Sequence, residues 1–104
     1  MILNLEDGSS FEEPDRETIA TALARLDGSE NGFAVLGSTD MTYIQTSGNP
    51  SSGFVIEYQD GSLDEHYGAT TDSISLAEVI VAFQEYLAGS DRWKLQFDWE
   101  KMDR

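Results

Sequence analysis

The clearest pattern of apolar and polar positions lies in the second half of the chain and predicts a helix from Leu76 to Ala88. Its apolar residues recur at spacings of three and four, which places them on one stripe of a helix. They are Leu76, Val79, Ile80, Phe83 and Leu87. Ser75 and Glu78 have the spacing of a capping box, in which two side chains satisfy free backbone amides of the first turn. Gly89 suits a left-handed cap. The sequence therefore signals both ends of this helix.

An earlier segment also has helical spacing. It begins at Pro14, a residue tolerated in a first helical turn, and stops at Gly28. One face of this segment is apolar and carries Ile19, Leu23 and Leu26. Asp15 and Glu17 suit the positive end of the helix dipole. We expect a second helix over this segment.

The remaining apolar residues alternate with a period of about two, which predicts strands. The expected strands cover residues 2–6, 10–11, 32–37, 41–46, 53–59, 62–67 and 93–100. The irregular stretch Ser47 to Ser52 is an expected exposed tip. The order is then ββαββββαβ, which describes an α+β domain with a mainly antiparallel β-sheet and two helices packed on one face. At 104 residues the whole chain, 1–104, is expected to form a single globular domain.

The Asp60-Gly61 pair predicts a two-residue hairpin turn. Such a turn fixes the register of the two strands that it joins. The expected facing pairs are Tyr58 with Leu63, Glu57 with Asp64, and Val55 with His66. One face of this hairpin is then apolar and turned to the core, with Leu63 among its members. The other face is polar, and it brings Glu57, Asp64 and His66 together in solvent.

Charge narrows the classes of partner. The chain has 6 basic and 20 acidic residues and a formal net charge of -14, and no lysine or arginine occurs from Leu26 to Asp91. Such a surface repels nucleic acid and anionic membranes and attracts basic proteins. The alternative to a partner-binding role is that the acidic residues serve only solubility or salt adaptation. There is no cysteine, so disulfides and thiolate metal sites are excluded.

The sequence predicts a location and excludes several kinds of site. The start, Met1 to Glu6, lacks the basic leader of a signal peptide, and no apolar stretch approaches the roughly 20 residues of a membrane span. We therefore expect a cytoplasmic protein.

The sequence contains no phosphate-cradling loop, calcium loop or nucleophile elbow. We therefore expect that the protein uses no cofactor. Directly opposed carboxylates of Glu57 and Asp64 beside His66 form the one candidate for catalysis or metal binding.

The segment from Leu76 to Gly89 also carries a family resemblance. It contains Phe83-x-x-Tyr86-x-x-Gly89 and is followed by Trp93-x-x-x-Phe97-x-Trp99. This combination resembles the type-one immunity proteins of bacterial polymorphic toxin systems and their small uncharacterised relatives. The resemblance implies a protein without catalytic activity that binds a toxin domain, frequently a basic nuclease, and blocks its active site.

Three hypotheses about function follow. The first is an acidic immunity-type inhibitor of a basic toxin. The second is an enzyme or a metal-dependent site on the Glu57, Asp64 and His66 face, and the third is a regulatory or structural interaction module of unknown partner. For the first, the expected partner-binding residues are Glu57, Asp60, Asp64, Glu65, His66 and Asp72. An unpaired strand at the sheet edge leaves both a monomer and a dimer open.

Overall fold

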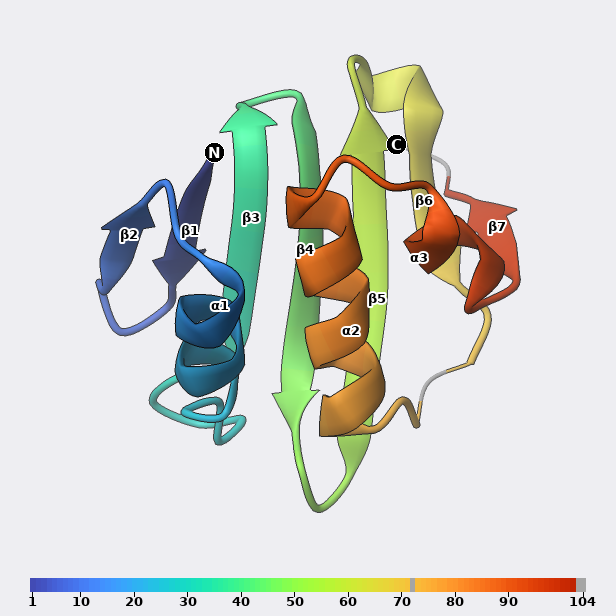
Figure 1. Ribbon diagram of the computed structural model, residues 1–104. Helices are drawn as coiled ribbons and strands as arrows, with labels where there is room; N and C mark the ends of the chain where they lie inside the picture. The colour runs from blue at the N-terminus through green and yellow to red at the C-terminus, as the bar shows by residue number, and fades with distance from the viewer. Residues whose placement is uncertain (72, 103–104) are drawn as a thin grey trace.

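The computed structural model describes residues 1–71 and 73–102, and it shows an α+β fold in which one antiparallel sheet carries its helices on one side (Figure 1). The strands are β1 (Ile2–Leu5), β2 (Ser10–Glu12), β3 (Phe33–Thr39), β4 (Thr42–Asn49), β5 (Gly53–Asp60), β6 (His66–Ala69) and β7 (Trp99–Lys101). The helices are α1 (Arg16–Leu23), α2 (Leu76–Leu87) and α3 (Arg92–Leu95), and η1 (Leu63–Glu65) is a 3-10 turn. The strand order is β2-β1-β3-β4-β5-β6-β7, and each described neighbouring pair is antiparallel. The predicted fold class is therefore confirmed.

The core lies between the sheet and the two longer helices. Alternate residues of the central strands point toward the helices because side chains switch faces at each step along a strand. The fully buried apolar side chains of the sheet are Leu3, Ala34, Leu36, Ile44, Phe54 and Ile56. From the helices, Ile19, Leu23, Val79, Ala82 and Phe83 pack against them. The helical stripes expected from the sequence are thus the buried faces of α1 and α2.

The capping signals of α2 are confirmed. The Ser75 Oγ accepts a hydrogen bond from the Glu78 amide at 3.2 Å, and the Glu78 carboxylate accepts one from the Ser75 amide at 3.2 Å. Gly89 follows the helix with a φ of 79°, in the left-handed region. Within the described residues, no helix is long and apolar enough to span a membrane.

Helix α1 is shorter than predicted. It begins at Arg16 and ends at Leu23 instead of running from Pro14 to a stop at Gly28, although Leu26 is still buried. Asp15 is the residue that caps it, because its carboxylate accepts a hydrogen bond of 2.7 Å from the Thr18 amide. This hydrogen bond holds the pKa of Asp15 below its ordinary value of 3.8.

The Asp15 cap gives the first prediction, an acid-dependent loss of stability. A carboxylate whose pKa is lower in the folded than in the unfolded state stabilises the fold above the unfolded value, and this contribution disappears as pH falls through the folded value. Asparagine caps helices as well as aspartate but does not titrate. Between about pH 5 and about pH 2, the melting temperature of Asp15→Asn should therefore fall less than that of the wild type.

The matched control is Asp91→Asn. Asp91 precedes α3 but makes no capping hydrogen bond with its side chain. Its variant should follow the wild-type curve of melting temperature against pH. An equally steep decline in Asp15→Asn and the wild type would contradict the assignment of Asp15 as the titrating cap.

The connection from β5 to β6 differs from the predicted two-residue hairpin. After Gly61, whose φ is 85°, the chain forms the turn η1, in which the Glu65 amide donates to the Ser62 carbonyl at 3.1 Å. The facing pairs are Glu57 with Gly68, Tyr58 with Tyr67, and Gln59 with His66. The predicted register is wrong by four positions, Gly68 standing where Asp64 was expected. Leu63, expected in the core, is 55% exposed.

The C-terminal segment also differs from its prediction. Trp93 to Glu100 was expected to be one strand, but it contains α3, a turn and the start of β7. Trp93 is buried while Leu95, two residues later, is 86% exposed, which a half-buried strand would not allow. The Trp99 indole Nε1 donates to the Lys94 carbonyl at 2.9 Å and ties the turn to the end of α3. The expected tip is shorter too, because β4 and β5 pair up to Asn49 and Gly53.

Candidate binding face of the sheet

In the part of the chain that the structure describes, the helices lie on one face of the sheet (Figure 1), and we call the opposite face the open face. The strand register arranges its side chains in rows that cross the sheet. The first row is Glu12, Ile2, Gly37, Tyr43, Gln59 and His66. The second is Ser10, Asn4, Val35, Gln45, Glu57, Gly68 and Glu100. The third is Phe33, Ser47 and Val55.

The open face combines accessible apolar side chains with negative charge. Ile2 is 42% and Phe33 44% exposed, and Val35 and Val55 on the same face are half-buried. The charged members of the three rows are carboxylates, and among these described positions there is no lysine or arginine. An apolar area rimmed by polar groups of one sign is typical of a surface that binds another protein.

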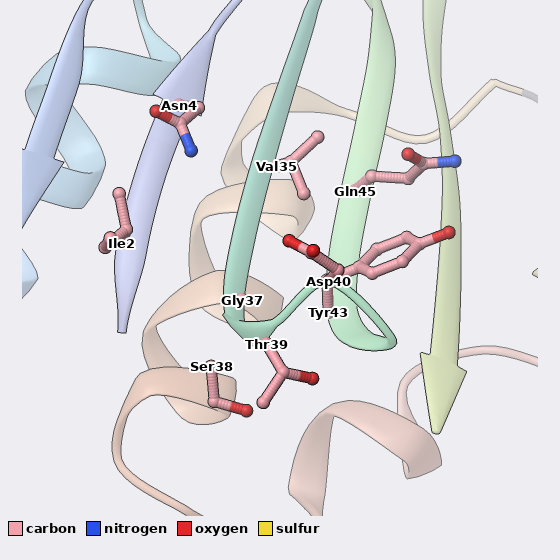
Figure 2. Close-up of a pocket in the computed structure, with 9 residues that line it drawn as sticks. All are labelled: Ile2, Asn4, Val35, Gly37, Ser38, Thr39, Asp40, Tyr43 and Gln45. Carbon is pink, nitrogen blue, oxygen red and sulfur yellow. The ribbon is translucent and has the colours of Figure 1, made fainter. Parts of the chain in front are cut away.

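A hollow of about 480 Å³ lies in the open face over β1, β3 and β4 (Figure 2). Ile2 and Asn4 line it on one side, and Tyr43 and Gln45 on the other. Its end is formed by the turn Ser38 to Asp40, so that the Asp40 carboxylate lies at the rim. A second hollow of about 300 Å³ adjoins it, and the two share Val35 and Gln45.

Gly37 explains the shape of the first hollow. The pairing of β3 with β4 shifts between Gly37 and Thr39, which marks a β-bulge. A Cβ atom on Gly37 would lie 2.9 Å from the Tyr43 Cβ and 3.0 Å from the Thr42 carbonyl oxygen. Glycine is therefore required at this position by the close approach of β4. Asp40, three residues later, also lines the hollow.

Beside the hollow, a buried histidine organises a polar network. His66 has no solvent exposure, its Nδ1 lies 3.0 Å from the Gln59 Oε1, and its Nε2 lies 2.6 Å from the Glu57 Oε1. The Gln59 Nε2 donates to the Met41 carbonyl at 3.3 Å, which fixes the orientation of the amide. Gln59 therefore presents its oxygen to Nδ1, which must be the donor.

Glu57 is in turn held by two neighbours on the open face. One is His66, whose Nε2 lies 2.6 Å from the Glu57 Oε1. Gln45 adds a donor to Glu57, from its Nε2 at 3.2 Å. Glu57 is thus held from two sides and acts as part of the supporting network of the open face.

Among the predicted site residues that the structure describes, two lie together. Glu57 and His66 are in contact as expected, because an even shift in register keeps His66 on the same face. Asp64 lies in η1 and is exposed, and it does not face Glu57. The expectation that His66 faces solvent is wrong. Asp72 lies outside the described residues.

The other two predicted residues that the structure describes, Glu65 and Asp60, lie at the end of the sheet near tyrosines of the opposite face. The Glu65 carboxylate accepts a hydrogen bond of 2.6 Å from the Tyr67 hydroxyl, which raises the pKa of Tyr67. Asp60 ends β5 next to a hollow on the helix-bearing side. In the part of the chain that the structure describes, no three His, Cys, Asp or Glu side chains are grouped so that they could hold a metal ion.

Sequence reasoning missed most of the open face. The residues it overlooked are Ile2, Phe33, Val35, Asp40, Tyr43 and Gln45. The alternation in residues 32–37 and 41–46 already contained the signal, because it separates Val35 and Tyr43 from the core positions. What the alternation does not contain is which strands are neighbours, and that decides which side chains share the hollow.

Comparisons with protein-family models, with curated proteins and with solved structures give no match for this chain.

Proposed function

We propose that the protein is a non-catalytic binding protein, an immunity-type inhibitor of a basic bacterial toxin domain, and that its open face is the surface that takes the partner. The observation that carries the proposal is the combination on this face of accessible apolar side chains, two adjoining hollows and carboxylates, with no lysine or arginine in its described rows. The cytoplasm is the compartment in which we expect such an inhibitor to act.

The two kinds of side chain have different tasks in this proposal. The negative field of a chain with a net charge of -14 accelerates encounter with a basic partner. The affinity comes from a few anchors that lose their contact with water, for which Ile2, Phe33 and the hollow beside Val35 are suited. An inhibitor of this kind needs no catalytic group, because covering the substrate channel of a nuclease is sufficient. A basic channel built for a polyanion also attracts carboxylates.

The alternative of an enzyme or metal-dependent site has less support. It needs Glu57, Asp64 and His66 in one accessible group, whereas Asp64 lies apart and His66 is fully buried. The remaining alternative is an interaction module whose acidity serves only solubility. It differs from the proposed inhibitor in that its binding should be insensitive to salt. Added salt weakens the electrostatic encounter and leaves apolar contacts in place.

The proposal is tested first by asking whether a toxin domain is encoded beside this gene. Such a domain would be purified and assayed with the protein for binding kinetics and inhibition. Asp40→Lys reverses a charge at the rim of the hollow and should slow association several-fold at low salt. Val35→Arg fills the floor and should accelerate dissociation. Glu57 is unsuitable for charge reversal, because it holds the buried His66.

Glu17→Lys is the control, since it reverses a charge on α1 and leaves the open face intact. Its kinetics should stay close to those of the wild type, apart from the small effect of net charge. Full inhibition by Asp40→Lys and Val35→Arg, together with loss of inhibition in Glu17→Lys, would move the binding surface to the helices. An absence of inhibition by the wild type would contradict the proposed function itself.

A further inference from the structure

A third hollow, with a distinct chemistry, lies on the helix-bearing side, where β5 ends beneath the C-terminus of α2 and α3. It has a volume of about 260 Å³, and three aromatic rings and two carboxylates are among the groups that line it. They are Tyr58, Tyr86, Trp93, Asp60 and Asp91. The Trp93 ring lies 4.8 Å from the Tyr58 ring at 80° and 5.3 Å from the Tyr86 ring at 57°. The rings therefore form an angled wall.

The hollow already holds a cation. The Lys94 Nζ lies 5.7 Å from the centroid of the Tyr58 ring and 5.3 Å from that of the Trp93 ring. These distances are within the range of about 6 Å over which a cation is attracted to an aromatic face. Lys94 is otherwise exposed to solvent, so that its side chain can leave the rings without unfolding α3.

The two carboxylates of the hollow lack a paired cation. Over residues 1–71 and 73–102, the ion pairs within 4.0 Å are those of the N-terminus with Glu13, Arg25 with Asp7, and His66 with Glu57. Neither Asp60 nor Asp91 is in this set. The negative charge of Asp60 adds to burial in raising the pKa of both Tyr58 and Tyr86. Asp60 thus acts on two of the three rings while its own charge stays without an ion-pair partner there.

We propose that this hollow is a binding site for an alkylammonium or guanidinium group, and that Lys94 is the resident cation that such a ligand displaces. Aromatic faces and carboxylates together are the chemistry that recognises organic cations. The ligand is either a free organic cation or the lysine or arginine side chain of a basic protein. The site lies on the side of the sheet opposite the open face and goes beyond the proposed function. The site is connected with the proposed function only if its ligand is a side chain of a basic protein partner. In that case the inference rests on the proposed function.

The test uses isolated probes, so its result does not depend on any toxin. Butylammonium, methylguanidinium and a capped tripeptide with a central arginine are titrated at constant ionic strength while the indole NH signal of Trp93 is followed by NMR. Lys94→Gln removes the resident cation and should bind the probes about two- to fivefold more tightly than the wild type. The double variant Asp60→Asn with Lys94→Gln should bind the probes about two- to fivefold more weakly than Lys94→Gln alone.

Two controls separate local binding from general charge effects. Arg92→Gln removes a positive charge from α3 at a residue outside the hollow, and Glu30→Gln removes a negative charge from the loop before β3. Both should leave probe affinity unchanged. Equal affinities in Lys94→Gln and Arg92→Gln, or no change in the Trp93 signal at millimolar probe, would overturn the site. Binding of the small ions without the tripeptide would assign the site to free cations, and the reverse would assign it to a protein side chain.

Discussion

Replacing His66 with alanine is expected to lower the free energy of unfolding by about 3 kcal/mol, with a range of about 2 to 5. The ring has no solvent exposure, so its removal leaves a cavity in the open face of the sheet. It also deprives the buried Gln59 oxygen and the Glu57 carboxylate of hydrogen-bond partners. Denaturant unfolding followed by tryptophan fluorescence gives the difference directly.

Asp64→Ala is the matched control, since the sequence places Asp64 in the same hypothetical group as His66. Asp64 is exposed in η1, and its replacement should change stability by less than about 0.5 kcal/mol. A cycle with Glu57→Gln should show a coupling of about 1 to 3 kcal/mol between Glu57 and His66. Equal losses in the His66 and Asp64 variants, or a coupling near zero, would contradict the network.

Replacing Gly48 with alanine should destabilise the protein by about 3 kcal/mol or more, which combines strained backbone and overpacking. Gly48 has a φ of 132°, a conformation that residues with a side chain rarely adopt. A Cβ atom there would also collide with the Gly53 carbonyl oxygen and lie 2.9 Å from the Phe54 Cα. Backbone atoms cannot move aside without separating β4 from β5 at the turn.

Gly61→Ala separates the two causes. Gly61 also has a positive φ, 85°, but no atom lies within 4 Å of the position that its Cβ would take. Its variant should lose only the conformational cost, about 1 to 2 kcal/mol. Thermal unfolding of both variants measures the difference, and a Gly61 variant as unstable as the Gly48 variant would show that the contact with Gly53 contributes nothing.

The hollow over β1, β3 and β4 and the hollow beside Lys94 suit different groups of a partner protein. The hollow in the open face adjoins the exposed Ile2 and carries its carboxylate, Asp40, at the rim, so it suits an apolar anchor with a basic neighbour. The hollow beside Lys94 has its rings angled around an ammonium group and suits the cation itself. A partner that used both would have to reach around the end of β5. Binding kinetics of Asp40→Lys and Lys94→Gln with one partner would show whether the two hollows act in the same complex.

The sequence by itself determined the elements whose signals are local. The capping box at Ser75 and the apolar stripe of α2 depend on residues three or four positions apart, and both appear as predicted. The alternation of the central strands separated core positions such as Ile44 and Ile56 from the open face. These patterns reflect the periods of helix and strand, which are properties of the backbone.

Only the tertiary structure decided what lies next to what. The period of Trp93 to Trp99 fits a strand, but the buried Trp93 packs against Tyr58 and Tyr86 in a helical turn, and no local pattern encodes that contact. The Asp60-Gly61 pair predicted a tight hairpin, yet η1 lengthens the connection and moves Asp64 away from Glu57. Strand neighbours, the bulge at Gly37 and the position of Lys94 over two rings all arise from pairings between distant segments. The physical reason is that such contacts are chosen by the packing of the whole core, whereas helix caps and strand alternation are fixed within a few residues.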